Sequence, residues 1–316
     1  MLSAFLPSAG RLVPLPAGEP LSRAVWIDLF QPTPDEAAAV AALGLDVPTL
    51  ADMEEIEISN RLYREGAVDC MTVVLTGHSQ TNTPISGPVS FILGPDRLVT
   101  VRHHASRPFE TYPTRADKFA LGCTRSHAVF LSLVEEITGR LADLLESAGR
   151  SLDTLGNAIH DTPRRSRAQE RLEVALRQLG REGHLIGILR LALLTLDRAL
   201  GFYAQNDRDP AQDNTVKALR RDVNALEVHT DFLSARIAQA TDLTLGMINL
   251  AQNSTVRIVS VVAVLFSPPM LVASIYGMNF AHMPELPQPW GYPAALLGMV
   301  ASSAVAWAYF RWKNWL

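Results

Sequence analysis

Apolar residues gather in two uninterrupted runs near the end of the chain. Residues 258–276 and 290–310 contain no charged side chain. Each run is as long as the about 20 apolar residues that a helix needs to cross a bilayer. Aromatic residues flank both runs, which is typical of membrane-spanning helices. We therefore predict two transmembrane helices here, rather than the buried helical hairpin of a soluble protein.

The charges beside these runs predict their orientation. Arg257 precedes the first run, whereas Arg311 and Lys313 follow the second in a basic tail, 311–316. The connecting segment, 277–289, has no Lys or Arg. Because basic residues stay on the cytoplasmic side of spanning helices, we predict that both termini are cytoplasmic and that this loop faces outward.

The pattern at the start of the chain is of a different kind. Short runs rich in β-branched residues, bounded by Gly, Pro and Asp, predict strands, and the last two are expected to form a hairpin. They lie at residues 24–29, 70–77, 89–94 and 97–104. Thr33 followed by Pro34 predicts the start of a helix, and a second short helix is expected within 49–62. Residues 1–125 are therefore predicted to form a cytoplasmic α/β domain.

Beyond residue 125 the apolar positions recur at helical spacing. We predict a cytoplasmic helical region over 126–212 and one long helix over 213–276, whose last part, 258–276, is the first span. A helix of this length spans on the order of 95 Å, so it needs other helices to pack against, including copies of itself. The expected fold is an α+β cytoplasmic domain followed by a long stalk helix and two C-terminal transmembrane helices.

Composition excludes several classes of function. The net charge of −4 implies no general affinity for nucleic acid. The sequence contains no Gly-rich phosphate loop, HExxH or CxxC motif, so we expect neither an enzyme nor a bound cofactor. Cys70 and Cys123 are too few for a disulfide framework and are expected to be buried thiols. His103 and His104 are adjacent, and neighbouring strand residues point to opposite faces, so they make a poor metal pair.

A thin polar stripe follows the first span. Its members recur every seven residues, so each lies about 20° around the helix axis from the one before it. They are Asn253, Ser260, Ser267 and Ser274. Two spanning helices cannot enclose an aqueous path, so a conducting protein must assemble copies around such a stripe. Small residues also allow close helix packing, and both interpretations hold when the packing is around a central axis.

The chemistry of the stripe favours a hydrated cation. It has no carboxylate within the membrane, and Mg²⁺ gives up its water reluctantly. Neutral Asn and Ser oxygens suit an ion that keeps its water. At the outer end, Asn279 is expected to act as an outer-sphere metal ligand, and Glu285 to raise the local cation concentration. Pro268 and Pro269 are expected to bend the helix.

The loop between the spans carries a specific motif. The letters "YGMNF" at 276–280, followed by "MPEL" at 283–286, resemble the CorA family of magnesium and cobalt transporters. The stretch 248–280, "GYP" at 291–293 and the terminal "KNWL" are similar to its proteobacterial branch. The resemblance covers essentially the whole chain and is strongest over its C-terminal part.

This resemblance implies an assembly and an activity. It implies a homopentameric funnel in a bacterial inner (plasma) membrane, in contact with lipid, with the long helix lining the pore and the second span around it. The expected activity is a channel for Mg²⁺, and also Co²⁺ or Ni²⁺, driven inward by the membrane potential. Mg²⁺ is then the substrate and a candidate regulator.

The resemblance also assigns roles to residues. Gly277, Met278 and Asn279 become the selectivity filter, Asn253 the inner mouth, and Asp242 a pore-facing acid. Val256 and Val259 lie where the family has an apolar constriction, which can gate by dewetting. The full set of expected pore-lining residues is Asp242, Asn253, Val256, Val259, Ser260, Ser267, Leu271 and Ser274.

The chain departs from the family at two places. Ala281-His282 follows the motif where many relatives carry an acid, so Glu285 is the sole acid in the loop. Segment 77–88, near the expected position of a regulatory acid, contains none. We therefore expect regulatory Mg²⁺ binding, if present, to involve acids of the long helix, of which the candidates are Asp213, Asp222, Glu227 and Asp231.

Two alternatives stay open from the sequence. A Zn²⁺ or Cd²⁺ transporter of the same architecture is consistent with His282 and the methionines near it. A membrane-anchored sensor or scaffold that does not conduct ions would need only the two spans.

Overall fold

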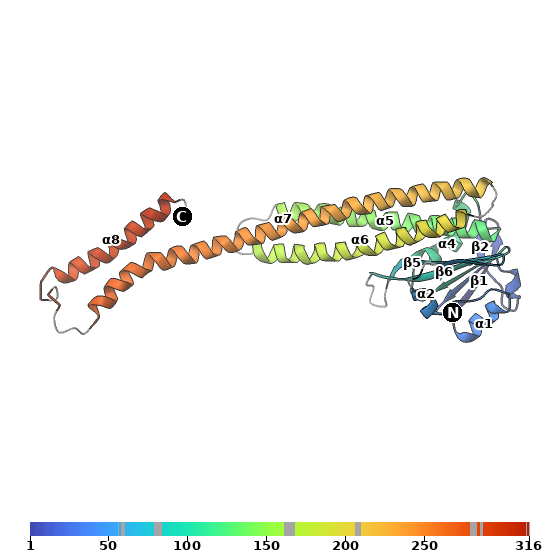
Figure 1. Cartoon of the computed structure of the whole chain (residues 1–316), viewed down its shortest axis with the longest axis horizontal. Coiled ribbons are helices and arrows are strands. Elements are labelled where there is room, and N and C mark those ends of the chain that lie inside the picture. Colours follow the sequence, from blue (N-terminus) through green and yellow to red (C-terminus); the bar gives the residue numbers. More distant parts are fainter. Residues whose placement is uncertain are drawn as a thin grey trace. The chain divides into compact units, whose positions relative to one another are not determined.

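The chain forms two compact units (Figure 1). The computed structural model describes residues 1–55, 57, 61–78, 84–160, 168–205, 210–278, 283–284, 287–313 and 315. The first unit comprises Met1–His160 and Leu176–Thr241, and the second comprises Asp161–Ala175 and Asp242–Leu316. Helix α7 (Pro210–Tyr276) is continuous over 67 residues and contributes to both units.

The first unit is built on a seven-stranded mixed sheet with the spatial order β2-β1-β3-β7-β6-β5-β4. β3 and β7 run parallel, and every other neighbouring pair is antiparallel. The strands are β1 (Leu2–Ser8), β2 (Arg11–Pro14), β3 (Trp26–Phe30), β4 (Leu62–Glu65), β5 (Val68–His78), β6 (Pro84–Leu93) and β7 (Leu98–Arg102).

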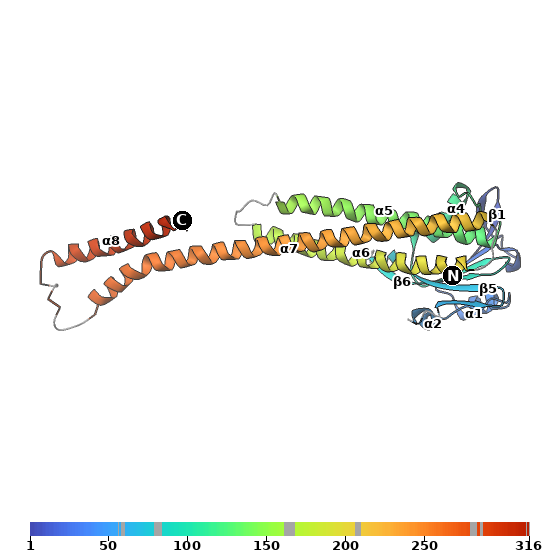
Figure 2. The same ribbon diagram turned by 45° about the horizontal axis from the view of Figure 1, so that its top comes forward.

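Helices cover both faces of this sheet. Figure 2 shows the short helices α1 and α2 against one face, and α4 and α5 on the other side. Within the described residues, the helices are α1 (Pro34–Ala41), α2 (Leu50–Glu54), α4 (Arg107–Arg115), α5 (Ser126–His160), α6 (Ala168–Ala204), α7 and α8 (Gly291–Trp312), with short 3₁₀ turns at Leu21–Arg23 and Ala116–Lys118. This mixed sheet with its helices confirms the predicted α+β fold.

Local sequence signals explain where the first helices begin. The Thr33 hydroxyl accepts a hydrogen bond from the Glu36 amide, and the Glu36 carboxylate accepts one from the Thr33 amide, which is a capping box. Thr49 and Asp52 form the same arrangement at the start of α2. The predicted helix start at Pro34 is confirmed.

The strand predictions were correct in kind but incomplete. The expected hairpin is confirmed, because β6 and β7 pair antiparallel from Val89 with Arg102 to Leu93 with Leu98. Strands β1, β2 and β4 were not predicted. Pro7 lies in β1 beyond the part that pairs with β3, where its missing N–H is tolerated. Helix α4 was missed because it contains Pro108 and Pro113.

Alternating side chains build a core on each face of the sheet. Ile27, Leu29, Val99 and Val101 pack with Val40 of α1 and neighbouring residues in one buried cluster. The opposite face is aromatic. Phe91 contacts Phe109 of α4 and Phe130 of α5, while Trp26 contacts Phe5 and Tyr112. Cys70 and Cys123 are both free and buried, as predicted.

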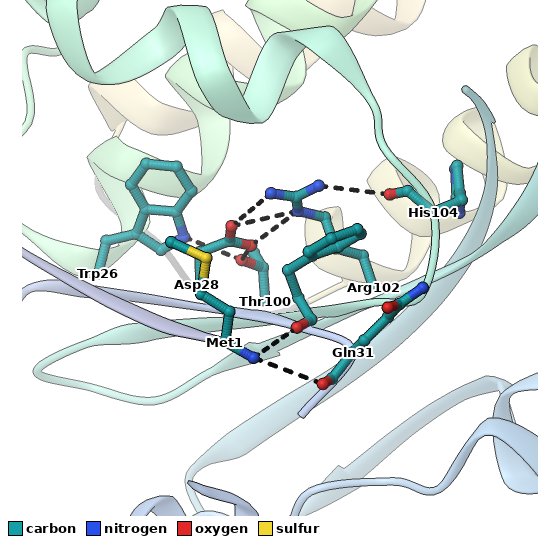
Figure 3. A network of polar contacts seen from close by, with 8 residues as sticks. Met1, Trp26, Asp28, Gln31, Thr100, Arg102 and His104 are labelled. Carbon is teal, nitrogen blue, oxygen red and sulfur yellow. Dashed lines mark hydrogen bonds and ion pairs between the residues drawn. The ribbon is translucent and has the colours of Figure 1, made fainter. Parts of the chain in front are cut away.

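A buried ion pair lies on the aromatic face of the sheet (Figure 3). Arg102 Nη2 is 2.8 Å from Asp28 Oδ2, and both side chains are more than 90% buried. The same Asp28 carboxylate accepts from the Thr100 hydroxyl, which accepts from the Trp26 indole N–H. The guanidinium lies 4.6 Å from the Phe30 ring centroid and donates to the His104 carbonyl. The two buried charges are therefore paired, and neutral groups, the Thr100 hydroxyl and the His104 carbonyl, provide further hydrogen bonds.

His104 occupies a niche that two glycines create. A Cβ atom at Gly87 would lie 2.5 Å from His104 Nδ1, and one at Gly77 would collide with the same ring and with the Ala105 carbonyl. Among the described residues, neither ring nitrogen of His104 has a hydrogen-bond partner. Burial, and then the charge of Arg102, lowers its pKa from 6.5 to about 4. His104 is therefore neutral at physiological pH.

The second unit contains the two apolar helical segments. Within the described residues, the helix over Gln212–Tyr276 and the helix over Gly291–Trp312 are long and apolar enough to cross a membrane, by length and composition. In each, only 6% of the apolar window is buried inside the structure. A segment this apolar and this exposed requires a nonaqueous environment or further protein around it.

We expect Asp28→Ala to destabilise the protein by about 3–5 kcal/mol, because it leaves the Arg102 guanidinium buried without its partner. The measurement is the thermal unfolding of the full chain in detergent. The matched control is Asp117→Ala, which removes the exposed pair with Arg11 and should cost about 1 kcal/mol or less. Equal losses for the two variants would contradict the importance of the buried pair.

We expect His104 to make stability fall as the pH is lowered from about 6.5 to about 4. In this window the unfolded chain takes up a proton on His104 that the folded chain does not, which costs up to about 3 kcal/mol. Unfolding midpoints at pH 7 and pH 4.5 should therefore differ less in His104→Gln than in the parent. Replacing the exposed His184 by Gln should leave the parent's pH dependence unchanged.

Candidate functional site

The predicted pore-lining side chains share one property. All of them are exposed on the surface of α7, and they are Asp242, Asn253, Val256, Val259, Ser260, Ser267, Leu271 and Ser274. One residue advances about 100° around a helix. Relative to Ser260, the other stripe members and Val256 and Leu271 then lie within about 40°, and Asp242 falls in line with them. The stripe is therefore a continuous, uncovered face.

Val259 departs from this face. It lies one residue before Ser260, which places it about 100° away around the helix, although it is 63% exposed. Val256 lies within the stripe. Of the two residues expected to form an apolar constriction, only Val256 is therefore in line with the polar positions along α7.

A different face of α7 packs against α8. Val261 is 5% exposed, and Leu265 four residues later is partly covered, so the two share one side of the helix. The Ser303 hydroxyl of α8 donates to the Leu265 carbonyl at 3.3 Å. α8 thus covers a face about 120° from the stripe. Sequence reasoning concentrated on the polar positions and missed this contact face, which the spacing of Val261 and Leu265 indicates.

The end of α7 carries the first part of the GMN motif. The Gly277 amide donates to the Ala273 carbonyl at 2.9 Å, and the Met278 amide donates to the Ile275 carbonyl at 3.2 Å. A Cβ atom at Gly277 would lie 3.2 Å from the Ala273 oxygen, so glycine allows this tight helix end. Asn279 and Glu285, the predicted filter amide and loop acid, lie outside the described residues.

Aromatic and basic residues gather at the end of α8. The Arg311 guanidinium lies 5.1 Å from the Trp307 ring centroid, and the Lys313 ammonium lies 5.4 Å from the Trp312 ring. Such amphipathic pairs are typical of the level of lipid headgroups.

The candidate regulatory acids of α7 are in unlike surroundings. Asp231 forms an ion pair with Arg190 of α6, with Oδ1 3.0 Å from Nη2. Glu227 is half-buried. Its burial, and then the carboxylates of Asp197 and Asp231, raise its pKa above the usual range. These acids lie near one another, but Arg190 and Arg220 already neutralise part of their charge.

The other two candidates are separate from this group. Asp222 is exposed and raises the pKa of Glu135 on α5 through its charge, after the larger effect of burial. Asp213 lies in the first turn of α7. Over the part of the chain that the structure describes, no group of three or more His, Cys, Asp or Glu residues is arranged to hold a metal ion.

Comparison with known proteins now identifies the family. The family model described as "CorA-like Mg2+ transporter protein" matches residues 22–312. The chain belongs to the CorA-like Mg²⁺ transporter family. It is 33% identical over 320 residues to the magnesium transport protein CorA of Escherichia coli K12, and 31% identical over 319 residues to that of Haemophilus influenzae. Each alignment covers 100% of both chains.

A solved CorA structure has the same fold. The CorA magnesium transporter from Methanocaldococcus jannaschii matches with a TM-score of 0.76 at 17% identity, over 100% of this chain and 99% of that one. At this identity the match concerns the fold. The resemblance drawn from the GMN motif is therefore confirmed at the level of the family, and CorA proteins are membrane transporters rather than enzymes.

We expect the two faces of α7 to differ in their access to water. In Ser267→Cys, the new thiol should react with a charged thiosulfonate reagent, because the predicted pore lining would face an aqueous path. In Val262→Cys, about 140° away on an exposed part of the helix, the thiol should stay unmodified in lipid nanodiscs. Mass spectrometry gives the extent of labelling. Equal protection of both would favour the interpretation that the serines serve only close helix packing.

Proposed function

We propose that this protein is a channel that carries hydrated Mg²⁺ across a bacterial inner membrane, and that Co²⁺ and Ni²⁺ follow the same path. The proposal rests on the family, since the relatives from Escherichia coli and Haemophilus influenzae are named as magnesium transport proteins. It also assigns both termini to the cytoplasm, because Arg311 and Lys313 follow the second span and the loop 277–289 has no basic residue.

The observation that carries the proposal is the exposed stripe of α7. In a single chain these polar side chains are exposed, whereas Ser303 of α8 contacts another face of the same helix. Copies of α7 arranged around an axis, with α8 outside, would turn the stripe inward and enclose a path. A homopentamer, as the family resemblance implies, is the assembly we propose.

The residues of the path match a hydrated ion. Along the stripe, the acid Asp242 precedes neutral Asn253 and Ser260, and no carboxylate follows within the span. Neutral oxygens accept hydrogen bonds from the water around Mg²⁺ without removing it. Val256 narrows the path between Asn253 and Ser260 and can close it by dewetting.

The outer mouth is assigned to the GMN motif. Gly277 allows the tight end of α7, and Met278 and Asn279 follow it in the sequence. A ring of Asn279 amides would select the ion through its water shell, and Glu285 would attract cations to the mouth. A membrane potential of 100 mV, negative inside, contributes about 4.6 kcal/mol to the entry of a divalent ion, so no ATP site is needed.

Regulation by cytoplasmic Mg²⁺ is proposed for acids of α7. Glu227 is the preferred candidate, since it is half-buried beside Asp197 and Asp231 and a divalent cation would relieve the repulsion among them. Asp213 and Asp222 are less suited, because neither is among the carboxylates that raise the pKa of Glu227.

Zn²⁺ or Cd²⁺ transport is the second candidate function. His282 follows the motif in a loop that also contains Met278 and Met283, and such soft ligands suit these metals better than Mg²⁺. Measuring the influx of Mg²⁺ and of Zn²⁺ into liposomes distinguishes the two candidate functions.

The test is influx into liposomes that contain the full-length protein, with Mg²⁺, Co²⁺ or Zn²⁺ outside and a potential set by K⁺ and valinomycin. We expect Mg²⁺ influx that grows with the potential. Asn279→Ala should lower it by about tenfold or more, because each lost hydrogen bond toward a charged species is worth about 1.5–3 kcal/mol. The matched control is Asn224→Ala, an exposed residue of α7 in the first unit.

Each other outcome has a definite meaning. Zn²⁺ influx without Mg²⁺ influx would overturn the proposed substrate in favour of the second candidate. No influx of any ion would favour a membrane-anchored sensor or scaffold. Unchanged influx in Asn279→Ala would contradict the amide ring while leaving transport itself intact.

A further inference from the structure

Two adjacent prolines remove hydrogen-bond donors inside α7. Pro268 and Pro269 both lie within the helix and have no N–H. In an α-helix, the carbonyl of residue i accepts from the amide of residue i+4. The carbonyls of Val264 and Leu265 therefore lose their helical donors. In the hydrocarbon region a main-chain acceptor without a partner costs several kcal/mol, so both need another donor.

The structure supplies a donor to one of them. Ser303 of α8 donates its hydroxyl to the Leu265 carbonyl at 3.3 Å, which is the carbonyl that Pro269 frees. The neighbouring Ser302 behaves differently, because its hydroxyl donates to the Met299 carbonyl of its own helix at 2.8 Å. Of these two serines, Ser303 thus joins the helices, and it does so at the Leu265 carbonyl, which has no helical donor.

The second carbonyl has different surroundings. Val264 lies about 100° around α7 from Leu265, on the side of Ser260 and Ser267, and is 48% exposed. Leu265 and Val261 share the other side of α7, where Ser303 of α8 donates to the Leu265 carbonyl. The two freed acceptors therefore divide between two faces, one held by α8 and the other toward the stripe. Figure 1 also shows that the α7 ribbon curves before its end at Tyr276.

We propose that Ser303 is a positioning residue of the ion path. Its hydroxyl takes the Leu265 carbonyl freed by Pro269, fixes the proline bend of α7 to α8, and leaves the Val264 carbonyl as the main-chain acceptor that faces the path. There the carbonyl accepts from the water shell of the passing cation, midway between Ser260 and Ser267. The part that concerns the ion rests on the proposed function, whereas the coupling of Ser303 to Pro269 does not.

The test is a double-mutant cycle. Ser303→Ala should lower the unfolding midpoint of the full chain in detergent. It should also slow Mg²⁺ influx by about threefold, which is the change that the free energy of one interhelical hydrogen bond in a membrane corresponds to. In a Pro269→Ala background the Leu265 carbonyl regains its helical donor, so Ser303→Ala should then change neither quantity. In a Pro268→Ala background the effect of Ser303→Ala should persist, because that proline frees the other carbonyl.

Two further variants separate this contact from general packing. Ser302→Ala, the matched control on the same helix, should leave influx and the midpoint unchanged. Ser303→Thr keeps the hydroxyl and should restore both. An effect of Ser303→Ala that is as large with Pro269→Ala as without it, or that Ser302→Ala reproduces, would overturn the proposal.

Failure of the proposed function would look different. A parent protein that carries no Mg²⁺ removes the influx readout for every variant, yet the coupling between Ser303 and Pro269 remains measurable in the unfolding midpoints. Coupling without influx would retain the contact and contradict the channel. Influx in the parent without coupling would retain the channel and overturn the role of Ser303.

Discussion

Different faces of helix α7 have different surroundings, and the rest of the second unit depends on this difference. One face carries the buried Val261 and also Leu265, whose carbonyl accepts from Ser303 of α8. The face that carries Ser260 and Ser267 is left uncovered. A helix has no spare hydrogen-bonding capacity inside a membrane, so the prolines are tolerated only where each freed carbonyl meets a donor. This requirement accounts for the separation between the α8 contact at Leu265 and the face of α7 that carries Ser260 and Ser267.

In the first unit the comparable requirement concerns buried charged groups, which also need partners. Asp28 and Arg102 are buried beneath α4, and their cost is offset because Thr100, the His104 carbonyl and the rings around them complete the network. The network joins β3 and β7, which pair in parallel, and so supports the register between these two strands. Helices α5 and α6 contact this sheet, α6 through the Thr195 hydroxyl, which accepts from the Val74 amide.

The sequence predicted the elements whose signals are local. Hydrophobic run lengths identified both apolar helices, the GMN motif identified the family, and Thr33 marked the start of α1. It could not predict α4, because Pro108 and Pro113 weaken the helical signal of that segment. Nor could it predict the pairing of Asp28 with Arg102, which are 74 residues apart. The contact of Ser303 with Leu265 escaped for the same reason, since it depends on how two helices rotate against each other rather than on either helix alone.

The two native cysteines have a practical consequence. Cys70 and Cys123 lie inside the first unit, and burial raises the pKa of both thiols, so they are poor nucleophiles at neutral pH. A thiol introduced on an exposed part of the chain would be the most reactive one present. The natural chain can therefore carry a fluorophore or spin label at a chosen site without prior removal of its own cysteines, and movements of α7 against α8 become open to spectroscopy in an otherwise unaltered protein.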